Sequence, residues 1–312
     1  MSKNKVPKEF IKTMQKCGIL MEKNTFPHLC VESNKIISAQ KIPGLKISYR
    51  TFQEGVKIKI VVEKENSIER PIFLCFGVLG KEGKQMILPQ IILKEHSKAK
   101  ILAFCVFPRA RNVFHKMEAE IKLKKGAELF YQERHYHGEN FGAEVLPNLK
   151  VSISQEATFK NEFVLDKGSV GKLKIFLKAQ LKENAFCEIF NKVIGKGRKD
   201  EIEIYDEILL NGENSRSLNK IRGVVIGGGK MFFKGQTEAK AKNARGHIDC
   251  QEIVVGNSIA QSLPVIIIKN PQARITHEAS VGKINQKELE TLMTRGLSER
   301  QAIDFIIKGV IK

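Results

Sequence analysis

The residues best suited to chemistry lie near the C-terminus, where Cys250 stands in an alternating run and the pair His277-Glu278 follows in the next segment. Thiolate sulfur is the soft ligand that iron–sulfur chemistry requires, whereas carboxylate and imidazole groups hold iron more loosely. One chain supplies a single suitable cysteine here, but a two-fold dimer would present two copies of Cys250 and Glu278, enough for four ligands. From these residues alone, the simpler interpretation is preferred: a half-buried strand cysteine and a surface glutamate.

A second group is Glu133, His135 and His137 in the segment ERHYHG. Residues two apart on a strand face the same way, so these three side chains could together bind Zn²⁺ or Fe²⁺ and serve a metalloenzyme. Two histidines at this spacing are a weak signal, and the favoured interpretation is a polar, solvated strand face.

Two familiar motifs are incomplete. The run GVVIGGGKM has Val224 where a P-loop requires its first glycine, and Met231 where it requires Ser or Thr. The pair His277-Glu278 could begin the zincin motif H-E-x-x-H, but Val281 stands where that motif requires its second histidine. Neither an ATP site nor zincin chemistry is therefore expected at these places.

The elements that must position these residues are mainly strands. From 33 to 284 most segments alternate apolar and polar residues, with Gly, Asn, Pro or Asp between them, and no long amphipathic helix intervenes. A sandwich, a barrel and a β-solenoid all fit this pattern, and the later half favours a solenoid. Residues 1–32 form a separate segment with one helix predicted within 1–20.

Two short helices are predicted in the C-terminal segment, residues 285–312. Asn285 caps the first helix and Gly296 ends it, while Ser298 and Gln301 form a capping box for the second. Both helices carry an apolar face and are too short to fold alone, so they must pack on the β region, on a partner, or on both.

The composition, at 42% hydrophobic and 28% charged residues, is that of a soluble globular protein. The polar N-terminus lacks a secretory signal, no apolar run is long enough to span a membrane, and we expect a cytoplasmic protein. Six widely spaced cysteines without a CxxC motif argue against a disulfide framework, and Cys75 and Cys105 lie in apolar runs typical of a core.

The formal net charge of +19 leaves open a basic, β-rich protein that binds nucleic acid. The lysines are scattered over the whole chain and mixed with glutamates, a pattern that also fits the heavily charged surface of a thermophilic protein. We favour that second interpretation and do not expect nucleic acid as the partner.

Four segments near the C-terminus, in this order, resemble the SufB/SufD family of iron–sulfur cluster assembly scaffolds: CQEIVVG, SLPVIIIKNPQA, HEASVGKI and RGLSERQA. The upstream region is compatible with the family's β-helix but offers few diagnostic residues. The chain lacks the extended N-terminal part of a typical SufB and looks like a minimal archaeal or anaerobe-type SufB-like protein.

The resemblance implies a right-handed parallel β-helix core over 33–284, between a short N-terminal helix and a C-terminal helical pair. It implies that Cys250 receives sulfur or holds a nascent, transient iron–sulfur cluster, with Glu278 and His277 beside it. SufB often has another acid at the position of Thr276, so that ligand would differ here.

The resemblance also implies partners. Residues 285–312 would bind a SufC-type ABC ATPase, and the late β-helix would pair in a homodimer or in a heterodimer with a SufD-like protein. The expected function is a non-enzymatic scaffold that builds the cluster at the dimer interface and passes it to recipient apo-proteins.

Overall fold

The computed structural model describes residues 11–12, 15, 26–138 and 142–311. The helix predicted within residues 1–20 therefore lies almost entirely outside the described residues.

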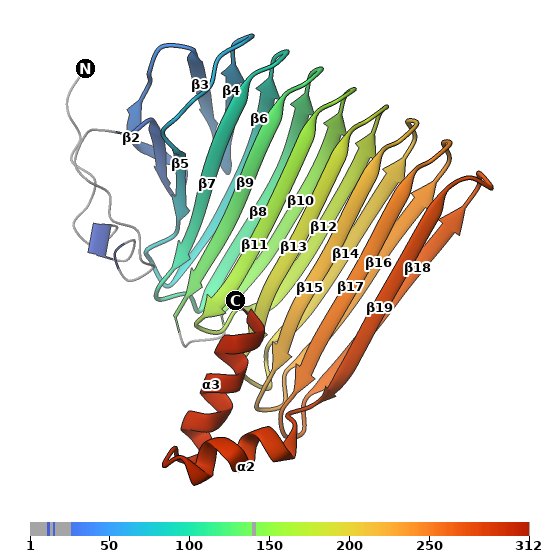
Figure 1. Cartoon of the computed structure of the whole chain (residues 1–312). Helices are drawn as coiled ribbons and strands as arrows, with labels where there is room; N and C mark the ends of the chain where they lie inside the picture. Colours follow the sequence, from blue (N-terminus) through green and yellow to red (C-terminus); the bar gives the residue numbers. More distant parts are fainter. Residues whose placement is uncertain (1–10, 13–14, 16–25, 139–141, 312) are drawn as a thin grey trace.

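The described chain winds into a β-solenoid whose coils stack along one axis (Figure 1). In spatial order, the first sheet contains β19 (Arg274–Lys283), β17 (Arg245–Val254), β15 (Arg216–Val225), β13 (Phe186–Gly195), β11 (Thr158–Lys167), β9 (Glu128–His137), β7 (Lys98–Phe107), β5 (Ile72–Gly77), β1 (His28–Glu32) and β2 (Lys35–Gln40). The second sheet contains β18 (Ile259–Ile268), β16 (Lys230–Ala239), β14 (Glu201–Leu210), β12 (Gly171–Leu181), β10 (Ala143–Ile153), β8 (Asn112–Leu123), β6 (Glu82–Leu93), β4 (Gly55–Val62) and β3 (Leu45–Phe52).

Strands within each sheet are parallel, except for the pairs β1–β2 and β3–β4 at the N-terminal end. The predicted parallel β-helix is confirmed, and a sandwich or barrel is excluded for the described residues. The first described strand, β1, begins at His28, upstream of the boundary expected at residue 33, and pairs in parallel with β5.

The coil length follows from the register of the first sheet. Asn191 pairs with Ile221, Ile221 with Cys250, and Cys250 with Ala279, so that one coil takes 29 or 30 residues. Alternation along each strand sends every second side chain inward, as in β12, where buried and more exposed residues alternate throughout. These inward side chains form one continuous hydrophobic core.

The turns at one edge of the solenoid repeat a single backbone conformation. A residue with φ between 55° and 63° occupies the same position in successive coils: His96, Gly126, Glu156, Asn184, Asn214 and Asn243. A small buried residue, Ser or Ala, follows each of them. The recurring KGA, ENA, ENS and KNA segments of the sequence thus mark the coil repeat, because Asn and Gly tolerate this left-handed conformation best.

The two predicted C-terminal helices are present as α2 (Gln286–Thr294) and α3 (Glu299–Ile311). The Asn285 side chain accepts hydrogen bonds from the backbone N–H groups of residues 287 and 288, and Ser298 and Gln301 bond reciprocally as a capping box. Ile307 and Ile311 of α3 pack on Ile194 and Val224, at the ends of β13 and β15. The helical pair is therefore anchored to one edge of the solenoid, as Figure 1 shows.

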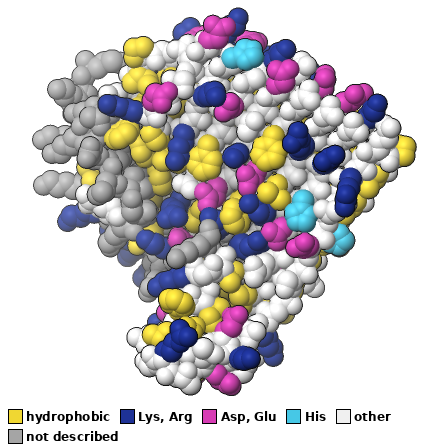
Figure 2. Space-filling view, in the orientation of Figure 1, with side chains coloured by type: hydrophobic (Ala, Val, Ile, Leu, Met, Phe, Trp, Pro, Cys, Tyr) yellow, Lys and Arg dark blue, Asp and Glu magenta, His cyan; other side chains and the backbone are white. Residues whose placement is uncertain are grey.

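The charged surface carries ion pairs between neighbouring coils, for example Lys178–Glu207 at 2.9 Å and Lys220–Glu188 at 2.8 Å. Basic and acidic side chains are interspersed over the face that Figure 2 displays. No helix among the described residues is both long and apolar enough to cross a membrane.

Candidate functional site near the C-terminal end of the solenoid

Cys250 points into the solenoid from β17. Its side chain is 2% exposed and belongs to the hydrophobic core, so the expected half-buried position was wrong. The strand lies between β15 and β19, with Ile221 on one side of Cys250 and Ala279 on the other. Only the last coil, formed by β18 and β19, separates this thiol from the C-terminal end of the solenoid.

The surroundings of Cys250 keep its sulfur protonated in the absence of a ligand. Burial raises the pKa of the thiol to about 12, partly offset by the nearby Ser262 hydroxyl on β18. The negative charges of Glu252 and Asp249 raise this pKa further. The thiolate is the form that binds metal. A cation that displaces the proton would therefore offset both the cost of burying the thiolate charge and its repulsion by the two carboxylates.

Glu252 is the acidic side chain that shares the inner face with Cys250. It lies two residues further along β17, about 7 Å between Cα atoms, and it is 1% exposed. Neither carboxylate oxygen has a hydrogen-bond partner of ordinary length among the described residues, and the Ser262 hydroxyl on β18 is the nearby polar group that lowers the pKa of Glu252. Gly223 on β15 makes room for it, because a Cβ at that position would approach the Glu252 Cγ to 3.1 Å and the Met231 sulfur to 2.5 Å.

His277 and Glu278 lie on opposite faces of β19. His277 pairs with the inward-facing Ile248 and so lies on the same side of the sheet as Cys250, at the open end of the solenoid. Glu278 pairs with Asp249 on the outer side. The structure thus brings Cys250 and His277 to one face but leaves Glu278 on the other face of the same chain.

The outer face beside Glu278 already holds an ion pair. Asp249 accepts hydrogen bonds from two nitrogens of Arg222, at 2.9 and 2.6 Å. Thr276, at the position where the resemblance led us to expect an acid, forms a hydrogen bond of 2.8 Å with the ring of His247. Glu278 itself is exposed at the last strand of the described sheet.

A row of buried polar side chains leads through the interior toward Cys250. Asn191 donates a hydrogen bond of 2.8 Å to Asp206 on β14, and Asn219 on β15 lies nearby. Burial raises the pKa of Asp206 to about 7, and its charge also acts on the Cys250 thiol. The later coils therefore enclose a polar strip, whereas most of the solenoid interior is apolar.

The second candidate group is also inside the solenoid. Glu133, His135 and His137 are at most 2% exposed, so the solvated strand face expected for them was wrong. Their alternate positions on β9 place them in the core because the inward face of that strand continues from Leu129 and Tyr131.

Comparison with known protein families identifies the family of this chain. Residues 80–310 match the family model for the SufBD core domain of SUF-system FeS cluster assembly. This chain belongs to the SufBD family.

Two archaeal relatives cover nearly the whole chain. An iron-sulfur cluster assembly SufBD family protein of Methanocaldococcus jannaschii is 35% identical over 285 residues, which cover 91% of this chain and 90% of the relative. A SufBD family protein of Pyrococcus horikoshii is 31% identical and covers 92% of this chain and 87% of its own length. A more distant SufBD relative, from Archaeoglobus fulgidus, is 27% identical over 246 residues.

Sequence reasoning missed one buried residue beside Cys250 in this candidate site, Glu252. The available signal was its position two residues after Cys250 on a predicted strand, which places both side chains on one face. Attention to the His277-Glu278 pair instead selected the glutamate whose side chain lies on the opposite face from Cys250.

We expect the buried Glu252 to make the folding stability of this SufBD protein depend on pH. Burial raises its pKa to about 7, so the folded state keeps a proton that the unfolded chain loses near pH 4.3. This contribution to stability is complete below the unfolded pKa and is lost as pH rises through about 7. For a shift of this size the loss amounts to about 3 kcal/mol.

The check is urea unfolding of the wild type and of Glu252→Gln at pH 5 and pH 8. We expect the variant to gain stability relative to the wild type at pH 8, by up to about 3 kcal/mol more than at pH 5. A difference between the two proteins that stays constant over this range would show that Glu252 is not buried as an acid.

Proposed function

We propose that this SufBD protein is a non-enzymatic scaffold on which an iron–sulfur cluster is assembled as cargo. The observation that supports this most directly is the Cys250 thiol, held with the buried Glu252 carboxyl group on the inner face of β17 and covered by the last coil. A soft sulfur ligand and a hard oxygen ligand together suit iron. The His277 imidazole lies on the same face.

In this proposal two protomers complete the ligand set. One chain offers one suitable thiolate, whereas a two-fold pairing at the C-terminal end of the solenoid brings two copies of Cys250 and His277 toward each other. Glu278 lies on the outer face of the last strand, and in this proposal each protomer contributes it as a ligand to the shared site across the interface. A SufD-like chain in place of the second copy would give the heterodimeric form.

The last coil differs from its predecessors in a way that supports pairing there. The outward positions of β16 carry Lys230 and Lys234, but the residues in register with them on β18 are Ile259 and Leu263. These two side chains are 53% and 47% exposed. Exposed apolar side chains on a final strand are typical of a protein interface.

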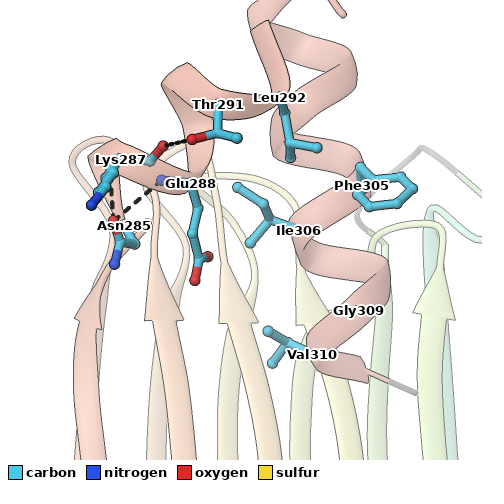
Figure 3. Close-up of a pocket in the computed structure, with 9 residues that line it drawn as sticks. All are labelled: Asn285, Lys287, Glu288, Thr291, Leu292, Phe305, Ile306, Gly309 and Val310. Carbon is cyan, nitrogen blue, oxygen red and sulfur yellow. Dashed lines mark hydrogen bonds between the residues drawn. The ribbon is translucent and has the colours of Figure 1, made fainter. Parts of the chain in front are cut away.

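The helical pair is the proposed contact for a SufC-type ABC ATPase. A groove between α2 and α3 is lined in part by Leu292, Phe305, Ile306 and Val310 (Figure 3). Ile307 and Ile311 bury the other side of α3 on the solenoid, which leaves this second apolar stripe uncovered among the described residues. An amphipathic helix of the ATPase domain would suit such a groove.

The proposed function is tested by anaerobic reconstitution. The protein, co-expressed with its SufC-type ATPase, is supplied with iron and sulfide, and the cluster is followed by visible absorption and by iron and sulfide content. We expect a labile cluster that transfers to a recipient apo-protein. Failure to take up a cluster in any assembly state would contradict the scaffold function.

Phe305→Asp is expected to weaken ATPase binding by roughly 10- to 100-fold, because it places a charge at an apolar contact. Phe305 is 62% exposed, so the substitution should leave the fold intact. Tyr49→Asp, at a 40% exposed aromatic residue on β3, is the matched control. Calorimetric titration of the ATPase into each variant measures the effect, and equal affinities would place the ATPase contact elsewhere.

A further inference from the structure

The interior of the solenoid holds a second cluster of ligand-type side chains, near its N-terminal end. Cys105 on β7 pairs in register with His135 on β9, and Glu133 lies two residues before His135 on the same inward face. One ligand atom from each of these three side chains lies within 4.8 Å of the other two. All three residues are at most 2% exposed.

A fourth ligand atom faces the sulfur from β8. Gln85 donates through its Nε2 to two backbone carbonyls, those of Ser33 and Gly77, so its Oε1 must be the acceptor for His115 Nδ1 at 3.1 Å. In the neutral imidazole this hydrogen bond places the proton of His115 on Nδ1. Its Nε2 therefore presents a lone pair to Cys105 Sγ, 3.7 Å away.

Groups around the cluster are arranged as the outer shell of a metal site would be. His137 Nε2 lies 3.4 Å from His135 Nδ1, and the Tyr131 hydroxyl donates to Glu133 Oε2 at 3.3 Å. Such contacts fix the ring orientation of a ligating histidine and the position of a ligating carboxylate. The remaining ring nitrogen of His137, Nδ1, is buried without a hydrogen-bond partner among the described residues.

We propose that Cys105, Glu133 and His135, with His115 Nε2 as the fourth position, bind one divalent transition-metal ion, Zn²⁺ or Fe²⁺. One thiolate, one carboxylate and two imidazoles are ligands that both ions accept. The thiolate and carboxylate together balance the charge of the ion, so the filled site is neutral in a buried position. Binding releases the thiol proton of Cys105, and His135 coordinates as the neutral imidazole through the ring nitrogen that carries no proton.

This site is separate from the cluster site at Cys250, which lies in the later coils. It also differs from the Glu133, His135 and His137 set suggested by sequence, because Cys105 and His115 join from neighbouring strands and His137 supports His135 from outside. The ion would cross-link β7, β8 and β9 from within the solenoid. Its role would be structural or as a store of iron, and neither depends on the scaffold function.

The test is metal content after expression with Zn²⁺ or, as a spectroscopic probe, Co²⁺ in the medium, since a site this buried must fill as the chain folds. After chelator treatment we expect one ion per chain in the wild type, in Cys250→Ala and in Cys187→Ala, the last a matched buried cysteine of the same core. Cys105→Ala and the near-isosteric Glu133→Gln should lose it. The Co²⁺ form should show a thiolate-to-metal absorption band that Cys105→Ala removes.

Circular dichroism identifies which variants are folded. If Cys105→Ala does not fold, Glu133→Gln provides the test. Full metal content in either folded variant would overturn the proposal. So would a wild-type protein without a thiolate band in its Co²⁺ form, or one whose only ion is lost in Cys250→Ala. These outcomes do not bear on cluster assembly at Cys250, which is read separately by sulfide content.

Discussion

Cys250→Ala is expected to leave this SufBD protein folded and to abolish cluster loading. The substitution removes the one thiolate on the inner face of β17, and carboxylate and imidazole groups alone do not hold an iron–sulfur cluster. Because only the sulfur atom is lost from a buried site, the cost in stability should be about 1 kcal/mol. Anaerobic reconstitution followed by iron and sulfide analysis measures the loss.

Cys187→Ala is the control for Cys250→Ala. Cys187 is equally buried on β13, where burial raises the pKa of its thiol well above the usual value, and its replacement removes the same atom. We expect full cluster loading in this variant. If Cys250→Ala loads as much sulfide as the wild type, the cluster is assembled elsewhere; if both variants lose it, the effect is one of packing.

The double variant Ile259→Lys, Leu263→Lys is expected to weaken the proposed self-association by at least roughly 100-fold. In a two-fold interface each substitution occurs twice, so four lysines would enter a contact made by apolar side chains. Both positions are about half exposed in the protomer, so the fold should survive. Sedimentation equilibrium measures the association, and cluster content measured on the same samples should fall with it.

Phe176→Lys is the control for the Ile259→Lys, Leu263→Lys double variant. Phe176 is 40% exposed on the outer face of β12, where it stacks on Tyr205 away from the last coil. A lysine at this position should leave association and cluster content unchanged. A double variant that stays dimeric would place the interface outside the outer face of β18, and a monomer that still loads a full cluster would show that one chain suffices.

Much of the fold could be read from the residues. Alternating runs bounded by turn residues predicted strands, and the absence of a long amphipathic helix excluded parallel sheets built from βαβ units. The caps at Asn285 and Ser298 lie where they were predicted because a cap depends only on side chains within a few residues. The family resemblance, also local, predicted the β-helix and singled out Cys250.

The residues of a single strand do not determine which of its two faces points into the core. In ELFYQERHYH both alternating sets contain apolar and polar residues, so the sequence left open which set points inward. The neighbouring coils decide it: Tyr131 stacks in register on Ile101, and the same parity carries Glu133, His135 and His137 into the core. Polar residues that seemed solvated are therefore buried.

The composition of each site was decided by register between strands about 29 residues apart. Glu278, adjacent in sequence to His277, projects from the opposite face to Cys250, whereas Glu252 shares its face. Cys105, which seemed an ordinary core residue, is joined by His115 and His135 from the following strands. The sequence by itself determined that this chain forms strands, where its helices are capped, and which cysteine resembles the SufB residue. Only the stacking of coils determined which side chains meet, because a one-residue change in register reverses the face of every side chain on a strand.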